Sequence, residues 1–299
     1  MPLSWPMDDP STISCPSGLY VVATPIGNLE DITLRAINIL ANVDLIAAED
    51  TRHTSRLLAR YFIQTPLISY HEHNEQQRAG QLIDKIRAGS AVALVCDAGT
   101  PSVSDPGYRL VCAAIENDLD IFPIPGVSAA VTALSASGLP TDTFVFVGFV
   151  PKKKGKRMDV LRSLIDEPRT LVFYESPRRV MALLEDIHVL MGDRPTVLAR
   201  EMTKLHEEFI RGRLTDVQTT LKARPEIKGE CTLLIGAAPS TRSLSDSELD
   251  VVIRQALSRP GARVSSVSKA LARQHGLPRK IIYEMALEIE KNTDTPTND

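Results

Sequence analysis

A short charged segment, Glu49 to His53, follows an apolar run and carries side chains that could act in acid–base chemistry. Glu49, Asp50 and His53 could each accept a proton from a hydroxyl group. Arg52 could hold a phosphate, or pair with one of the carboxylates in a bidentate geometry. The alternative is a structural ion pair between Asp50 and Arg52, and the sequence does not rank the three candidate bases.

Three loops combine glycine with proline, and each directly follows a short apolar run. Proline fixes the backbone angle φ and glycine has no Cβ, so these turns are stiff and let the backbone approach a ligand closely. In open α/β sheets, loops at the carboxyl ends of parallel strands line the crevice where small ligands bind. The sequence therefore predicts a cofactor site, with ordinary strand-to-helix turns as the alternative. The loops are Thr24 to Asn28, Asp97 to Pro101 and Pro123 to Ser128.

The glycine pattern argues against a phosphate-bearing cofactor. No G-x-G occurs, so the dinucleotide fingerprint is absent, and Gly155-Lys156 lacks the other residues of a P-loop. Rigid loops with backbone donors and acceptors, together with the carboxylate of Asp97, suit a ligand with ribose, adenine and amino-acid parts. S-adenosylmethionine fits that description, and its sulfonium charge favours a partly acidic pocket.

Composition indicates a globular protein with two or three domains, because 299 residues that are 43% hydrophobic can bury substantial cores. No apolar stretch approaches the roughly 20 residues needed to span a bilayer. Residues 1–17 contain two aspartates and no basic start, so they are predicted to be a disordered leader, not a signal peptide. The four cysteines form no C-x-x-C pair, which indicates a reducing compartment. We therefore expect a soluble, cytoplasmic protein.

Two basic clusters stand out against a net charge of -3. One occupies residues 152–157, between two apolar runs, and is expected to be an exposed linker. The other lies between Asp250 and Glu284, where there is no acidic residue. Local basic patches favour a polyanion such as RNA or DNA, although a lysine run can equally be a solvated loop. The candidate RNA-binding residues are Lys152, Lys153, Lys154, Lys156, Arg157, Lys269, Arg273, Arg279 and Lys280.

Alternating strand and helix patterns predict an α/β fold with two α/β domains, residues 18–139 and 140–240. Residues 243–291 are predicted to form three short helices, and Gly-Leu-Pro between the last two resembles a helix-turn-helix. The polar residues 292–299 are expected to be a disordered tail.

Three local predictions bear on the sites. A helix is expected over residues 33–43, with Asp31 as a plausible N-cap. Another is expected over residues 159–165, after the basic linker. In a strand, His71 and His73 would share a face and could bind a metal. No third ligand is evident, so substrate contact or the start of a helix is favoured and no metal is predicted.

Several of these segments together resemble the ribosomal RNA small subunit methyltransferase I family, within the tetrapyrrole methylase-like superfamily. The resemblance covers about residues 18–239. It rests on Thr24 to Ile32, Ala48 to Thr54, Asp97 to Pro101 with Asp105 to Gly107, and Phe173 to Ser176.

The resemblance implies two α/β domains with S-adenosylmethionine in the cleft between them. It also implies 2′-O-methylation of a cytidine ribose in 16S rRNA near the decoding centre, by a homodimer. The three-helix end looks like the helix-turn-helix extension on many such proteins. Corrin-type relatives carry a G-x-G-x-G-D loop after the first strand, where this chain has Pro25 to Asn28. That departure argues against a tetrapyrrole substrate.

The resemblance and the position of the loops at the carboxyl ends of strands indicate the same cofactor loops. The family geometry adds residues at strand ends of the second domain. The alternative is that these residues are simply polar side chains at the ends of strands, with no role in binding. Rival functions are a tetrapyrrole or diphthine-type methyltransferase and a non-catalytic nucleic-acid-binding protein. The candidate cofactor-binding residues are Pro25, Gly27, Asn28, Asp97, Ala98, Gly99, Thr100, Pro101, Pro125, Gly126, Ser128, Tyr174, Glu175, Glu201 and Glu230.

Overall fold

The computed structural model describes residues 14–238, 246–258, 262–275 and 277–293. Most of the predicted leader and tail, residues 1–13 and 294–299, lies outside this range. The chain divides into two compact units, which are described separately. The first comprises Met1–Arg162 with Thr170–Gly236, and the second comprises Ser163–Arg169 with Ala237–Asp299.

The first unit begins with a five-stranded sheet in which every paired strand is parallel. The strand order is β3-β2-β4-β1-β5, so β1 lies between β4 and β5. All of the carboxyl ends therefore meet at one edge, as the loop pattern predicted. The strands are β1 (Gly18–Val22), β2 (Leu45–Ala48), β3 (Leu67–Ser69), β4 (Ala91–Val95) and β5 (Ile121–Ile124).

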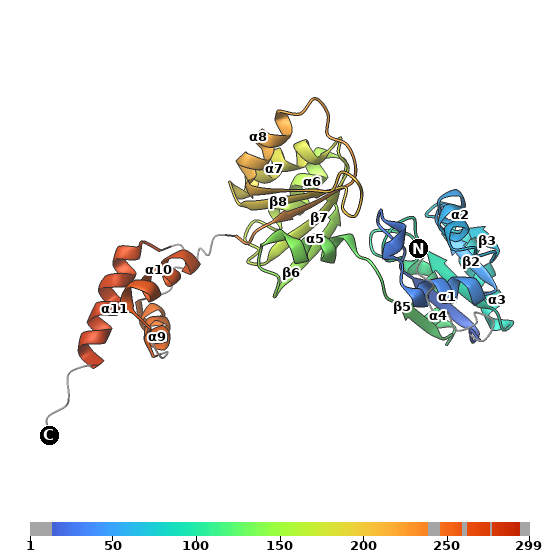
Figure 1. The fold of residues 1–299 in the computed structure, drawn as a ribbon, viewed down its shortest axis with the longest axis horizontal. Helices are drawn as coiled ribbons and strands as arrows, with labels where there is room; N and C mark the ends of the chain where they lie inside the picture. Colours follow the sequence, from blue (N-terminus) through green and yellow to red (C-terminus); the bar gives the residue numbers. More distant parts are fainter. Residues whose placement is uncertain (1–13, 239–245, 259–261, 276, 294–299) are drawn as a thin grey trace, which may run out of the picture. The chain divides into compact units, whose positions relative to one another are not determined.

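Helices cover both faces of this sheet (Figure 1). Leu40 and Leu57 pack on one face, whereas Leu82 and Leu110 pack on the other. Successive side chains of a strand point to opposite faces of the sheet. Strands with almost continuous apolar sequence therefore contribute side chains to the hydrophobic cores on both faces. The helices are α1 (Leu34–Asn42) and α2 (Thr51–Arg60) on the first face, with α3 (Glu75–Arg87) and α4 (Tyr108–Glu116) on the second.

The N-cap of α1 is Thr33, not Asp31. The Thr33 hydroxyl oxygen accepts a hydrogen bond from the Ala36 amide at 3.0 Å, which satisfies a free amide of the first turn. Asp31 instead ends a short 3-10 turn, Leu29–Asp31, two residues before that cap. The prediction of Asp31 as a cap was therefore wrong, because this extra turn places it outside the helix.

The first unit also contains a mixed five-stranded sheet of order β6-β7-β10-β8-β9. Only β6 and β7 pair in parallel, and the other neighbours are antiparallel. The strands are β6 (Phe144–Phe149), β7 (Thr170–Glu175), β8 (Pro195–Arg200), β9 (Glu208–Arg213) and β10 (Cys231–Ile235).

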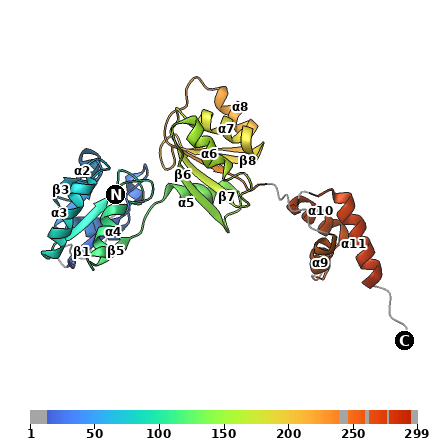
Figure 2. The same cartoon turned by 180° about the vertical axis from the view of Figure 1, so that it is seen from behind.

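Helices also lie on both sides of the mixed sheet (Figures 1 and 2). On one face, Ala133 and Leu134 of α5 (Ala129–Ser137) pack against Val172 and Leu234. The opposite face carries α6 (Lys154–Arg162), α7 (Val180–Met191) and α8 (Leu214–Lys222).

The basic segment after β6 is not a linker. Helix α6 starts at Lys154, not near residue 159, so most of this segment forms its first turns. Arg157 is buried, and its Nη2 lies 2.6 Å from Asp186 Oδ2 on α7. The prediction that Arg157 is exposed for RNA binding was therefore wrong, because the helix turns this side chain inward.

The second unit contains the three helices that the sequence predicted, α9 (Asp246–Leu257), α10 (Val264–His275) and α11 (Arg279–Thr293). They enclose a core of their own, to which Leu249, Ile253, Leu271 and Ile282 contribute. Throughout the described ranges, no helix is both long enough and apolar enough to cross a membrane.

Candidate active site

The loops after β1 and β4 are joined by a pair of backbone hydrogen bonds. The Thr24 amide donates to the Gly99 carbonyl at 2.8 Å, and the Gly99 amide donates back to the Thr24 carbonyl at 2.9 Å. Gly99 has φ of +82°, a conformation that glycine adopts without steric cost. The first two glycine/proline loops therefore form one rigid platform.

The loop after β5 packs against the same platform. The Thr100 hydroxyl donates to the Val127 carbonyl at 3.2 Å. A Cβ at Gly126 would lie only 2.9 Å from the Cβ of Ala23, so a glycine is required for this close approach. The predicted convergence of the three loops is confirmed.

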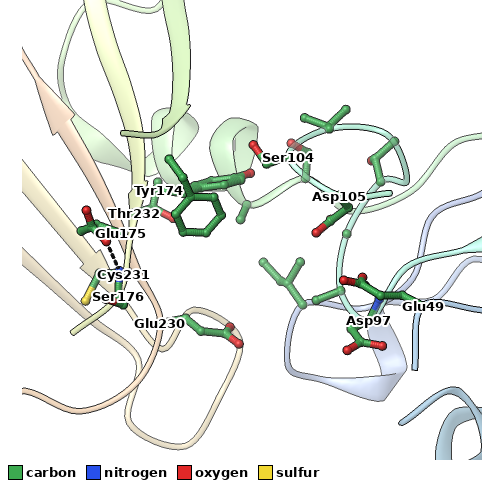
Figure 3. A pocket seen from close by; sticks show the side chains of 18 of the residues that line it. Glu49, Asp97, Ser104, Asp105, Tyr174, Glu175, Ser176, Glu230, Cys231 and Thr232 are labelled. Atoms are coloured by element: carbon green, nitrogen blue, oxygen red, sulfur yellow. Dashed lines mark hydrogen bonds between the residues drawn. The ribbon is translucent and has the colours of Figure 1, made fainter. Parts of the chain in front are cut away.

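A cavity of about 370 Å³ lies between these loops and the strand ends of the mixed sheet (Figure 3). Its size falls within the usual range of roughly 300 to 1,000 Å³ for small-molecule sites. The cofactor candidates that line it are Asp97, Ala98, Gly99, Thr100, Ser128, Tyr174, Glu175 and Glu230.

A second cavity, of about 270 Å³, shares Ile26, Asp97, Ala98 and Glu230 with the first. Two further cofactor candidates, Pro25 and Gly27, line this neighbouring cavity. Gly126 lines a separate surface hollow together with Ser128. The candidates Asn28, Pro101, Pro125 and Glu201 line none of these cavities.

Two of these four residues have clear structural roles. The side chain of Asn28 caps the 3-10 turn by accepting from the Glu30 amide at 3.1 Å. The Glu201 carboxylate accepts from the Glu230 amide and from the Lys204 ammonium, both at 3.0 Å. Glu201 therefore contacts the cavities only indirectly, through Glu230 and Lys204, which do line the smaller one.

Three carboxylates surround one side of the larger cavity. The Asp97 amide donates to Glu49 Oε2 at 3.3 Å, and Asp97 Oδ1 accepts from the Asp50 amide at 3.1 Å. Burial raises the pKa of Glu49. Burial also raises the pKa of Asp105 to about 6, and the nearby charge of Glu49 adds to the effect. Figure 3 shows Glu49, Asp97 and Asp105 on the same wall.

The other charged residues at the start of α2 are arranged differently. Asp50 is the N-cap of α2, and its carboxylate pairs with Arg52 Nη2 at 2.7 Å, so these hydrogen bonds lower its pKa. The structural ion pair considered from the sequence is therefore present. His53 Nδ1 lies 3.9 Å from Asp97 Oδ1, and His53 lines the smaller cavity.

Residues 18–218 match the model for tetrapyrrole (corrin/porphyrin) methylases. Ribosomal RNA small subunit methyltransferase I of Micromonospora olivasterospora is 46% identical over 266 residues, covering 89% of this chain and 85% of the relative. The protein of the same name from Synechocystis sp. is 47% identical over 276 residues, covering 91% and 98%.

This chain belongs to the ribosomal RNA small subunit methyltransferase I family. The resemblance identified in the sequence is confirmed, and so is the two-sheet tetrapyrrole methylase-like fold. Uroporphyrin-III C-methyltransferase from Thermus thermophilus, solved with S-adenosylhomocysteine, superposes with a TM-score of 0.53 at 22% identity. That match covers 73% of this chain and 97% of the solved one, and it shows the shared fold.

The residues around the larger cavity of this family member fit S-adenosylmethionine. Asp97, Glu49 and Asp105 provide the acidic wall that a sulfonium cation favours, and Ser128 and Thr100 supply hydroxyl groups. Tyr174 provides an aromatic surface, and its ring meets that of Phe149 edge-on at 5.6 Å. Aromatic and apolar walls with a few placed polar groups are typical of cofactor sites.

Sequence reasoning did not assign Asp105 or Phe149 to the site. Asp105 belongs to a segment that the resemblance quoted, so that motif was the available signal. Ser102 and Ser104 adopt φ of +70° and +66°, and this unusual backbone turns the segment towards the cavity. Phe149 is the last residue of β6, and only the pairing of β6 with β7 brings it beside Tyr174.

The remaining basic candidates divide between the two units. Lys152, Lys153, Lys154 and Lys156 are exposed at the start of α6. In the three-helix unit Lys269, Arg279 and Lys280 are exposed, whereas the side chain of Arg273 lies outside what the structure describes.

His71 and His73 lie just before α3, with ring centroids 5.9 Å apart. The Asn74 side chain accepts from the His71 amide at 2.9 Å, which fits the start of a helix. Among the described residues, no group of three or more potential ligands is placed to hold a metal ion.

Proposed function

We propose that this protein transfers a methyl group from S-adenosylmethionine to the 2′-oxygen of a cytidine ribose in 16S rRNA, near the decoding centre. We further propose that it acts in the cytoplasm as a homodimer on the small ribosomal subunit. The observation that carries the proposal is the 370 Å³ cavity with its acidic wall, in a chain 47% identical to a ribosomal RNA small subunit methyltransferase I.

When bound, S-adenosylmethionine supplies an already activated methyl group. The protein's task is then to hold and orient the two reactants. The Asp97-to-Thr100 loop and Ser128 would hold the polar parts of the cofactor, and Tyr174 would face an apolar part. Because backbone hydrogen bonds fix the first two loops to each other, the platform is preorganised before any ligand binds.

Methylation of a hydroxyl group releases a proton, and Glu49 or His53 could accept it. Glu49 lines the larger cavity, and burial makes its carboxylate a stronger base than an exposed one. Asp105, on the same wall, is a third candidate. Asp50 is less suitable, because its N-cap hydrogen bond and its pairing with Arg52 stabilise the charged form. Arg52 would orient substrate or Asp50.

The exposed lysines of α6 and the basic residues of the three-helix unit would hold rRNA by its phosphates. Phosphate contacts position a protein on RNA and make its binding depend on salt, without choosing the base. Neutralising Lys152, Lys153 or Arg279 should therefore weaken binding and reduce its salt dependence.

The deciding experiment is transfer of tritiated methyl from S-adenosylmethionine to small ribosomal subunits that lack the modification, followed by mapping of the labelled nucleotide. The proposal expects one 2′-O-methylated cytidine in the decoding region. Label on a base, or at another nucleotide, would contradict the assigned position. Cofactor binding without transfer to any RNA would favour a small-molecule substrate instead.

A further inference from the structure

The smaller cavity differs from the cofactor cavity in the charge of its walls. It is lined by His53, Arg56 and Lys204, whereas the larger cavity has no lysine, arginine or histidine in its lining. The two share four residues, so whatever occupies the smaller one lies directly beside the cofactor site. The smaller cavity thus carries cationic side chains as well as the shared Asp97 and Glu230, so an anionic group could bind at its cationic side, next to the acidic wall of the cofactor cavity.

Arg56 is the cation in this cavity whose charge is not already balanced. The Lys204 ammonium contacts Glu201 at 3.0 Å and Glu230 at 3.1 Å. His53 faces Asp97 at 3.9 Å. In the part of the chain that the structure describes, no acidic side chain forms an ion pair with Arg56, which is exposed.

Arg56 belongs to a basic row along α2. Arg52, Arg56 and Arg60 are four residues apart, so they lie on one face of the helix, and all three are exposed. Asp50, Arg52, His53 and Arg56 also line a surface hollow of about 340 Å³ at the start of this helix. The row thus continues from the smaller cavity onto the surface.

This row is unfavourable for the helix itself. Like charges four residues apart repel, and Arg52 in the first turn opposes the helix dipole, although Arg60 in the last turn is favourably placed for it. The first turn of α2 holds no acidic residue, and Asp50 balances only Arg52. Glu30 and Asp31 are the acidic groups near the other end, beside Tyr61. An anionic ligand along the row would relieve the repulsion.

We propose that Arg56, with Arg52 and Arg60, forms a phosphate-binding track that leads the target RNA strand along α2 into the smaller cavity. This inference rests on the proposed function, because that function makes the substrate an RNA. Guanidinium groups bind phosphate oxygens in a bidentate manner, and successive phosphates of one strand could contact successive arginines. The track would place the target ribose beside the cofactor cavity.

The test compares Arg56→Gln with Lys85→Gln in the full-length protein. Lys85 is an exposed cation on α3, which covers the opposite face of the parallel sheet, so both variants lose one positive charge. The affinity for a 16S rRNA fragment containing the decoding region is measured over a range of salt concentrations. S-adenosylmethionine binding without RNA, by calorimetry, is the second readout.

Arg56→Gln should weaken RNA binding about threefold to tenfold and lower the slope of log affinity against log salt by about 0.7 to 0.9. Arg56→Glu should weaken binding further, and both should bind S-adenosylmethionine as the wild type does. If Arg56→Gln and Lys85→Gln have the same RNA affinity and slope, the track is overturned, while methyl transfer by the wild type still supports the proposed function. If the wild type transfers no methyl group to RNA and binds no RNA, both proposals are overturned.

Discussion

The amide of Ala130 donates a hydrogen bond to the hydroxyl oxygen of Tyr174 at 3.0 Å. Ala130 lies in the first turn of α5, two residues after Ser128, and Tyr174 lies near the end of β7. The bond ties the third glycine/proline loop to a strand of the mixed sheet. Two walls of the cofactor cavity are thereby held in a fixed relation.

Tyr174→Phe should weaken S-adenosylmethionine binding about threefold to tenfold and destabilise the protein by about 1 kcal/mol. The phenyl ring keeps its packing, but the buried Ala130 amide loses its acceptor. Calorimetric titration and urea unfolding would measure the two effects. Tyr20→Phe is the control, because it removes a hydrogen bond to Pro16 at 2.8 Å outside the cavity. An equal loss of cofactor affinity in Tyr20→Phe would contradict the assigned role.

Gly126→Ala should weaken cofactor binding by about tenfold. The new methyl group would meet Ala23 at 2.9 Å, so the loop after β5 must move away from the loop after β1. Gly80→Ala, on α3, has no atom within 4 Å of the added methyl group and should stabilise the helix by about 0.5 to 1 kcal/mol. Equilibrium dialysis with labelled cofactor compares the two variants, and unchanged binding by Gly126→Ala would show that the close loop packing is dispensable.

Asp105→Asn should stabilise the ligand-free protein above about pH 6. Burial raises the pKa of Asp105 from 3.8 to about 6, so the folded state holds its proton more tightly than the unfolded state does. The stability of the fold therefore falls as the pH rises from about 4, where the unfolded state begins to lose this proton, to about 6, above which the cost of the buried carboxylate is complete. Below about pH 4 both states are protonated and the cost vanishes. Allowing for partial exposure to solvent, we expect a gain of about 1 to 2 kcal/mol at neutral pH.

Urea unfolding at a series of pH values would measure this effect. Asp84→Asn is the control, because it makes the same carboxylate-to-amide change at an exposed position on α3. A gain from Asp105→Asn that persisted below about pH 4 would indicate a cause other than ionisation of this carboxyl group.

Arg157→Leu should destabilise the protein by about 3 to 5 kcal/mol. The substitution leaves the buried carboxylate of Asp186 without its main partner, since Lys154 lies 3.8 Å away and is exposed. Lys156→Leu, one residue earlier and exposed, should change the free energy of unfolding by less than about 0.5 kcal/mol. Thermal or urea unfolding distinguishes the two, and similar small losses would show that the ion pair is not structural.

The convergence of the three glycine/proline loops was predictable, because each loop is recognisable from its own short stretch of sequence. Thr24, Asp97 and Ser128 each follow an apolar run, and parallel strands place their carboxyl ends at one edge. The helix starts were less predictable. Thr33 and Asp31 both have side chains suited to capping, and only the backbone of the intervening turn selects Thr33.

Long-range pairing decided the rest. Arginine is usually a surface residue, but Arg157 is buried because α6 packs on α7 and brings Asp186 within 2.6 Å of it. The acidic wall likewise joins Glu49, which follows β2, to Asp97 and Asp105, which lie in the connection between β4 and α4. Burial there raises the pKa of Asp105, and burial depends on the folded environment, not on residue type.

The sequence by itself determined the family, the α/β fold with its three-helix end, and the three glycine/proline loops that converge. These features depend on residue types at short spacings, because such local patterns determine where strands and turns form. Only the tertiary structure decided which charged residues remain available for chemistry. Asp50 forms an ion pair with Arg52, and Lys204 forms ion pairs with Glu201 and Glu230, whereas Arg56 forms none among the described residues. Charge pairing depends on distances between side chains, which the order of residues does not specify.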